Sequence, residues 1–141
     1  MRIACYHNLP SGGAKRVVRE HCRGLRAAGH EVVVYELETA DHDFCDVSDV
    51  ADRVLRVPYT WHEPLRRGPK GRWLIPLRNL ALLYRGHCRL AQIGARVAEE
   101  MGAGGFDLAY VHHDMFETAP SLLRYASIPT VLRRSASRQA T

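Results

Sequence analysis

Apolar residues along this chain follow two alternating patterns, which are short continuous runs and longer stretches with helical spacing. The continuous runs end at polar residues or proline and predict strands that are buried on both faces of a parallel sheet. They cover residues 3–6, 31–37, 54–57, 107–112 and 130–132. The helical stretches predict crossovers, which join parallel strands with a right-handed turn. We therefore expect an α/β domain with an open, mostly parallel sheet and helices on both faces.

Two helices carry most of the helical pattern. The first runs from Ala14 to a C-terminus at Gly29, and its polar face is expected to hold a series of basic residues: Lys15, Arg16, Arg19, Arg23 and Arg26. The second begins at Leu74 or Pro76, and one broad apolar stripe follows it: Leu77, Leu80, Ala81, Tyr84, Cys88, Ala91, Ala95, Ala98 and Met101. A third, short helix is expected from Thr118 or Ala119 through Tyr125.

Length and composition bound the class of protein. The chain has 141 residues, of which 46% are hydrophobic and 25% are charged, values typical of one globular domain. It contains no apolar run long enough to cross a membrane and no signal-peptide pattern, so we expect a cytoplasmic protein. The four cysteines form no Cys-x-x-Cys pair and are expected to be reduced.

Charge is distributed unevenly along the chain. Residues 36–52 carry seven acids and no Lys or Arg, whereas residues 53–89 carry nine bases and one acid, Glu63. The basic part could face a polyanion or the inner face of an anionic membrane. Alternatively, these charges could be only the solvated surface of a loop and a helix. We expect no nucleic acid partner.

The junction between the first strand and the first helix is the first candidate site. Ser11 can cap the helix through its hydroxyl, and Gly12 and Gly13 leave the backbone open to a phosphate. Lys15 or Arg16 could add positive charge. The same glycines could instead only permit a tight turn. The spacing is neither Gly-x-Gly-x-x-Gly nor that of the P-loop, although Glu36 or Glu38 lies at the distance expected for a ribose contact.

A pair of histidines is the second candidate site. His112 and His113 close the strand at residues 107–112, at the same carboxyl edge as the glycine turn. An imidazole there could polarise or deprotonate a sugar hydroxyl, or it could be a hydrogen-bonded structural histidine. Because adjacent strand residues point to opposite faces, we expect only one of the two to line a cleft. No metal site is expected, because the acids, His42 and Cys45 of residues 41–46 match no metal motif.

A Pro-, Gly- and Arg-rich segment, residues 59–72, is expected to form a long surface loop. Its aromatic and basic residues could contact an acceptor or an anionic lipid surface: Trp61, Arg66, Arg67, Lys70, Arg72 and Trp73.

These features together resemble glycosyltransferase family 4, whose members are retaining enzymes with the GT-B architecture. The resemblance rests on residues 7–16, on the end of the first helix at residues 25–32, and on residues 110–113, 121–125 and 128–129. It implies a Rossmann-like N-terminal domain, residues 1–132, that mainly holds the acceptor and faces a second domain that holds a nucleotide-sugar. It further implies that Gly12 and Gly13 approach the donor diphosphate and that His113, with His112 second, lies near the transferred sugar.

The chain departs from the family in one respect. The Glu-x7-Glu donor motif of the second domain has no counterpart here, and residues 133–141 are expected to form an irregular basic tail. We therefore expect a truncated or frameshifted acceptor-side portion that is inactive alone and that a separate donor-domain chain could complete. The partners would be a nucleotide-sugar, as a substrate rather than a cofactor, and a sugar or lipid-linked acceptor. The alternative is a non-catalytic basic module that binds an anionic membrane or glycan.

Overall fold

A computed structural model of the chain describes residues 1–60, 75–117 and 119–133. Within these ranges five strands form one sheet in the order β3-β2-β1-β4-β5, and each neighbouring pair is parallel. The strands are β1 (Arg2–Asn8), β2 (Glu31–Leu37), β3 (Arg53–Val57), β4 (Leu108–Asp114) and β5 (Thr130–Arg133). The five expected strands are confirmed, and β5 extends to Arg133. The aromatic and basic residues of the expected loop, Trp61 to Trp73, lie outside the described residues.

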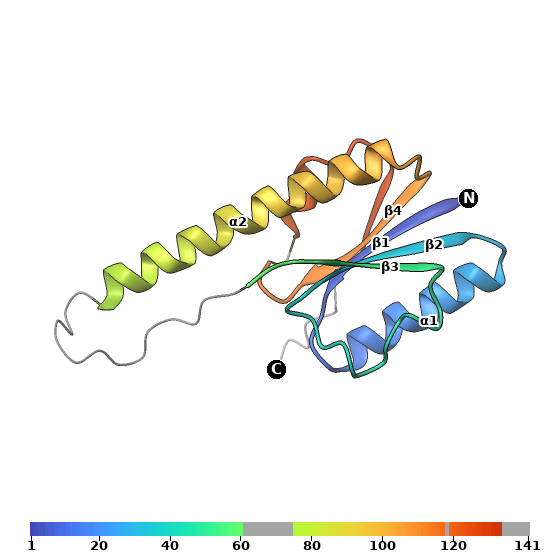
Figure 1. Cartoon of the computed structure of the whole chain (residues 1–141), viewed down its shortest axis with the longest axis horizontal. Coiled ribbons are helices and arrows are strands. Elements are labelled where there is room, and N and C mark those ends of the chain that lie inside the picture. The colour runs from blue at the N-terminus through green and yellow to red at the C-terminus, as the bar shows by residue number, and fades with distance from the viewer. Residues whose placement is uncertain (61–74, 118, 134–141) are drawn as a thin grey trace, which may run out of the picture.

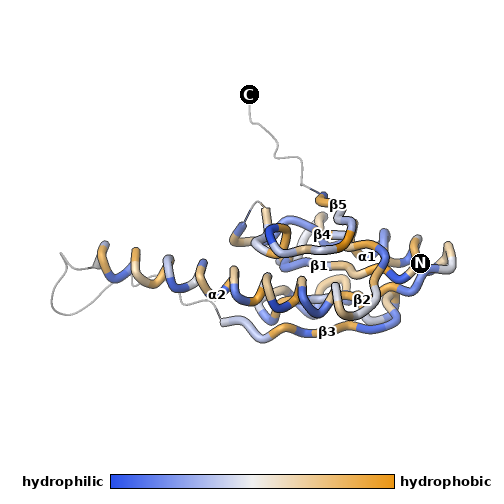
Figure 2. Tube along the Cα trace, turned by 90° about the horizontal axis from the view of Figure 1, so that it is seen from above, coloured by the Kyte–Doolittle hydropathy of each residue, from blue (hydrophilic) through white to orange (hydrophobic). Residues whose placement is uncertain are grey.

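Two helices cover opposite faces of this sheet (Figure 1). Helix α1 (Gly13–Ala27) follows β1, and α2 (Ile75–Ala103) precedes β4. The view from above shows the strands side by side in the stated order, with α2 reaching well past them (Figure 2). The expected Rossmann-like α/β fold with helices on both faces is confirmed. None of the helices in the described part of the chain has the length and apolarity that a membrane crossing needs.

The core has two halves because successive strand residues point to opposite faces. On one face Ala4, Tyr6 and Val33 pack with Leu90, Val97 and Met101 of α2. On the other face Ile3, Cys5 and Val34 pack with Val18 and Cys22 of α1. All four cysteines are free thiols, as expected.

A close approach fixes α2 against the turn that follows β4. A Cβ built on Gly94 would lie 2.7 Å from the backbone nitrogen of Leu122, so glycine is required for this packing. Leu122 lies in a single 3-10 turn, Ser121–Arg124, where we expected a helix from residue 118 or 119 to Tyr125. The helix is therefore shorter than expected, because Pro120 has an extended backbone (ψ 137°) and lies outside the helical turn.

The expected apolar stripe of α2 is only half buried. From Leu90 onward α2 contributes fully buried residues, whereas every described residue between Pro76 and Arg89 is exposed or partly exposed. The first half of the helix extends past the edge of the sheet, so its apolar residues have no sheet to cover (Figure 1).

Candidate functional site

The carboxyl ends of β1 and β4 form the natural ligand edge of this sheet. β1 lies between β2 and β4, so the connections that leave β1 and β4 diverge to the two sides of the sheet at this point. Ligands of open α/β sheets bind in the crevice outside such a switch point. β1 ends here with His7 and Asn8, and β4 ends with His112, His113 and Asp114.

The glycine turn lies directly after β1 at this edge. Gly12 is the N-cap of α1 and has a φ of 147°, a conformation that side-chain-bearing residues rarely adopt. A Cβ at Gly12 or Gly13 would meet nothing within 4 Å, so the space beside the turn is open. The first helical turn contains no acidic residue, which leaves its backbone N–H groups and the positive dipole end available to an anion.

The expected helix cap by Ser11 is wrong. Ser11 lies one position before the N-cap, and no side chain among the described residues caps α1. Ser11 is exposed, and its hydroxyl is a minor cause of the lowered pKa of Asp41, whose largest cause is the hydrogen bond from the backbone N–H of Phe44.

Lys15 lies beneath the turn rather than on the polar face of α1, where we expected it. Its side chain is fully buried, and its Nζ is 3.2 Å from Oε1 of the equally buried Glu36 at the end of β2. His42 reaches Oε2 of Glu36 through its Nδ1 at 2.9 Å. Because these partners occupy Glu36, the expected ribose contact by this carboxylate has no support in the geometry. Arg16, the next residue, is exposed and lies over the ring of Phe44.

His7 completes this buried charged cluster. Its Nε2 lies 3.8 Å from Oε1 of Glu36, and its side chain is fully buried. Burial lowers the pKa of His7 from 6.5 to about 4, a shift that Glu36 opposes and Lys15 reinforces. His7 is therefore neutral at physiological pH, and the charge of Glu36 is balanced by Lys15.

The two histidines of β4 lie together, which corrects the expectation that they point to opposite faces. Their ring centroids are 4.5 Å apart and the rings are inclined by 47°. The cause is an irregularity in the pairing of β4 with β1 between Tyr6 and Asn8, because an extra residue in a strand breaks the alternation of side chains.

Their exposures nevertheless differ. His112 is 1% exposed, and its Nδ1 has no hydrogen-bond partner among the described residues. Burial, with a smaller contribution from His113, lowers the pKa of His112 to about 4. His113 is partly exposed, and burial also lowers its pKa. At neutral pH His113 is therefore an uncharged imidazole that a ligand can reach.

A second polar network, which the sequence analysis did not find, lies across the same edge. Asp114 is 4% exposed and accepts hydrogen bonds from Nδ2 of Asn8 at 2.9 Å and from the backbone N–H of Phe116 at 2.8 Å. Burial raises the pKa of Asp114 to about 6. Thr39 donates its hydroxyl to Oδ1 of Asn8 at 2.9 Å. The sequence does contain a signal for this network, because Asn8 and Asp114 are polar residues at the ends of two buried strands.

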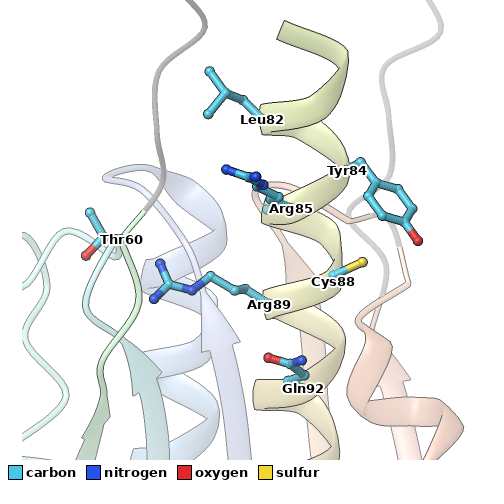
Figure 3. Close-up of a pocket in the computed structure, with 8 residues that line it drawn as sticks. Thr60, Leu82, Tyr84, Arg85, Cys88, Arg89 and Gln92 are labelled. Atoms are coloured by element: carbon cyan, nitrogen blue, oxygen red, sulfur yellow. The ribbon is translucent and has the colours of Figure 1, made fainter. Parts of the chain in front are cut away.

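A cavity of about 530 Å³ lies beside α2, between the helix and Thr60 (Figure 3). Arg85 and Arg89 project from α2 toward the Thr60 side, whereas Tyr84 and Cys88 project from the other side of the helix (Figure 3). Thr60 follows β3, so the cavity opens near the carboxyl edge of the sheet. Its arginines suit an anionic ligand.

Comparison with known proteins gives one match at the level of sequence. The sequence profile of Glycosyltransferase Family 4 matches residues 11–133. No curated protein matches the chain.

Two solved structures are similar in shape. The C-terminal domain of a hydrogenase from Pyrococcus furiosus has a TM-score of 0.53 and 13% identity, with 93% of this chain and 89% of that one covered. A UGT transferase from Siraitia grosvenorii, crystallised with UDP, has a TM-score of 0.45 and 12% identity over 92% of this chain. The present chain spans only 27% of that transferase.

Proposed function

Because the chain belongs to glycosyltransferase family 4, we propose that its sugar-transfer role is that of the acceptor-side domain of a retaining enzyme. This domain, residues 1–132, would form one wall of a GT-B cleft, and a nucleotide-sugar would be the donor. One observation supports this role above the others. The open glycine turn and the reachable imidazole of His113 lie at the same carboxyl edge, beside the switch point between β1 and β4.

The glycine turn is the proposed contact for the donor diphosphate and the transferred sugar. Gly12 and Gly13 offer backbone N–H groups at the start of α1 with open space beside them. Ser11 and Arg16 are exposed at the rim, where they can contact the phosphates directly. Lys15 acts from below, where its ion pair with Glu36 holds the start of α1 against the end of β2.

His113 is the proposed contact for the sugar, with His112 in a supporting role. A neutral imidazole can accept a proton from a sugar hydroxyl or donate a hydrogen bond to it. His112 packs against His113 and, because its pKa is about 4, stays uncharged across the physiological range. This keeps a positive charge from forming beside the neutral His113.

The acceptor, a sugar or a lipid-linked sugar, would approach from the cavity beside Thr60 and α2. The basic and aromatic residues Trp61 to Trp73, which lie outside the described residues, remain proposed contacts for it. Transfer also needs a donor-binding domain for the nucleoside, so we propose that this chain is inactive alone. We propose that a donor-binding domain supplied as a separate chain restores transfer.

A transfer assay tests this function. The chain is incubated with radiolabelled UDP-, GDP- and ADP-sugars and acceptor glycolipids, alone and joined to the donor-binding domain of a characterised family 4 enzyme. We expect no transfer by the chain alone, and transfer in the joined protein that falls at least tenfold in His113→Ala, whereas the exposed-site control Asp43→Asn stays active. Turnover by the chain alone, or an unchanged rate in His113→Ala, would refute the proposal.

A further inference from the structure

The first half of α2 is a helix with little of the protein against it. The residues of α2 that are fully buried begin at Leu90 and continue with Gly94, Val97, Ala98 and Met101. Figures 1 and 2 both show the preceding part of the helix extending beyond the sheet. Its apolar side chains are therefore not explained by the core.

Large apolar side chains line this extending part. Leu77 is 62% exposed, Leu80 is 64% exposed and Tyr84 is 71% exposed. These residues are three and four positions apart, so they lie on one side of the helix within two turns. A contiguous exposed stripe of this kind marks an interaction site more often than isolated surface residues do.

Arginines accompany the apolar stripe. Residues 75–98 contain no Asp or Glu, and Arg78, Arg85 and Arg89 are all exposed. None of these three forms a salt bridge with another residue in the described ranges, in contrast to Arg96, whose Nε lies 3.3 Å from Oε1 of Glu100. The extending part of α2 is therefore both apolar and cationic.

The two kinds of side chain are arranged side by side around the helix. Arg78, Arg85 and Arg89 are spaced by seven and four residues and form a second stripe, displaced by about 100° from Leu77 and Tyr84. Figure 3 shows this separation directly, with Arg85 and Arg89 on one side of α2 and Tyr84 on the other. Leu90, by contrast, defines the side of the helix that faces the sheet, and Tyr84 lies about 120° from it.

We propose that this surface, Leu77, Leu80 and Tyr84 with Arg78, Arg85 and Arg89, docks on an anionic lipid bilayer. The apolar stripe would enter the boundary between headgroups and acyl chains, and the arginines beside it would contact the lipid phosphates. Charge complementarity selects this occupant, because a cationic surface without acids attracts anionic lipid and repels a second copy of itself. The docking surface shares Tyr84, Arg85 and Arg89 with the cavity proposed for the acceptor, but it lies apart from the glycine turn and His113 at the ends of β1 and β4.

Vesicle co-sedimentation of the full chain tests the docking surface. Vesicles of phosphatidylcholine alone are compared with vesicles that contain equal parts of phosphatidylcholine and phosphatidylglycerol. We expect binding to the anionic vesicles only, and weaker binding at high salt because salt screens the arginines. Replacing Arg78, Arg85 and Arg89 with Gln should weaken it on the order of a hundredfold. The double variant Leu80→Gln/Tyr84→Gln should weaken it about tenfold or more.

A matched control distinguishes an effect of this particular surface on binding from an effect of the net charge of the chain. Replacing Arg23, Arg53 and Arg124 with Gln removes the same charge from exposed positions elsewhere, and binding should then stay within about threefold of the original. Circular dichroism confirms that each variant is folded. The proposal is overturned if the unmodified chain does not bind anionic vesicles, or if both triple variants weaken binding equally. It is also overturned if sedimentation velocity shows a dimer that Leu80→Gln/Tyr84→Gln dissociates while vesicle binding persists.

Discussion

Nδ2 of Asn8 donates to Oδ1 of Asp114 at 2.9 Å, and this bond joins the end of β1 to the end of β4. The backbone reinforces the junction, because the N–H of Met115 donates to the carbonyl of Asn8 at 3.1 Å. Asn8 lies four residues before Gly12, and Asp114 directly follows His113. The bond therefore sets the distance between the two candidate contacts, the glycine turn and the imidazole.

Removing this bond should destabilise the fold. In Asp114→Ala the buried amide of Asn8 and the N–H of Phe116 lose their acceptor, and we expect the free energy of unfolding to fall by about 1–3 kcal/mol. Urea denaturation measures this change. The control is Asp43→Ala, an exposed carboxylate, which should change stability by less than about 0.5 kcal/mol. Equal effects of the two substitutions would contradict the role of Asp114.

Stability should rise with pH between about 4 and 6. His7 and His112 have pKa values of about 4 in the folded chain, below their ordinary value of 6.5, so the unfolded chain binds more protons at these two sites in this window. Asp114 acts in the opposite direction, because its pKa of about 6 makes the folded chain bind a proton that the unfolded chain has lost. On unfolding, the two histidines take up more protons than the one carboxyl group releases, so the net slope of stability against pH is positive.

The variant Asp114→Asn isolates the opposing contribution. Without a proton on Asp114 in the folded chain, the rise in stability with pH should steepen by about 1.4 kcal/mol per pH unit. Urea denaturation at several pH values between 4 and 6 gives both slopes. Parallel slopes in the two proteins, or a fall in stability with rising pH, would show that the protonation assignments are wrong.

The buried pair of Lys15 and Glu36 should show strong coupling. Lys15→Met leaves the carboxylate of Glu36 without its cation, and we expect a loss of roughly 3–5 kcal/mol. Glu36→Gln in the same chain removes the isolated charge, so the double variant Lys15→Met/Glu36→Gln should recover part of that loss. Arg16→Met, a change of an exposed cation one residue along, is the control and should be nearly neutral. Additive single effects in the double-mutant cycle would exclude the coupling.

Glycines that look alike in the sequence should respond oppositely to alanine. A Cβ at Gly94 would lie 2.7 Å from the nitrogen of Leu122, whereas a Cβ at Gly24 would meet nothing within 4 Å. Thermal unfolding should therefore show a lower midpoint for Gly94→Ala, through a loss of about 1–3 kcal/mol. Gly24→Ala should have a raised midpoint, because alanine favours helix by about 1 kcal/mol. A raised midpoint for Gly94→Ala would mean that α2 does not pack against the Ser121–Arg124 turn.

Local patterns predicted most of this fold, because apolar runs and helical spacing determine where strands and helices form. The positions of the strands and of the two long helices followed from residues such as Val32 to Val34 and Val18 to Cys22. Burial of Lys15 did not follow, because only the tertiary fold brings Glu36 to its ammonium. The pairing irregularity that places His112 against His113 likewise depends on contact with another strand.

The candidate site, like the fold, was predictable where it depends on local sequence and not where it depends on tertiary contacts. The sheet edge and the glycine turn follow from strand order and local sequence, whereas the bond between Asn8 and Asp114 links residues 106 positions apart. The exposed first half of α2 could not be foreseen either, because an apolar stripe at helical spacing has the same pattern whether or not a sheet lies beneath it.

A nuclear magnetic resonance titration of the isotope-labelled chain shows whether the glycine turn and His113 face the donor. Inorganic pyrophosphate should shift the backbone amides of Gly12 and Gly13 in a saturable way and leave the His113 imidazole unchanged. A nucleotide-sugar of the preferred type, found with UDP-, GDP- and ADP-sugars, should shift both, while the amide of Gly24 stays constant as the control. Saturable shifts confined to other surfaces, or no saturable shift at Gly12 and Gly13 with any of these ligands, would show that the glycine turn does not bind the donor diphosphate.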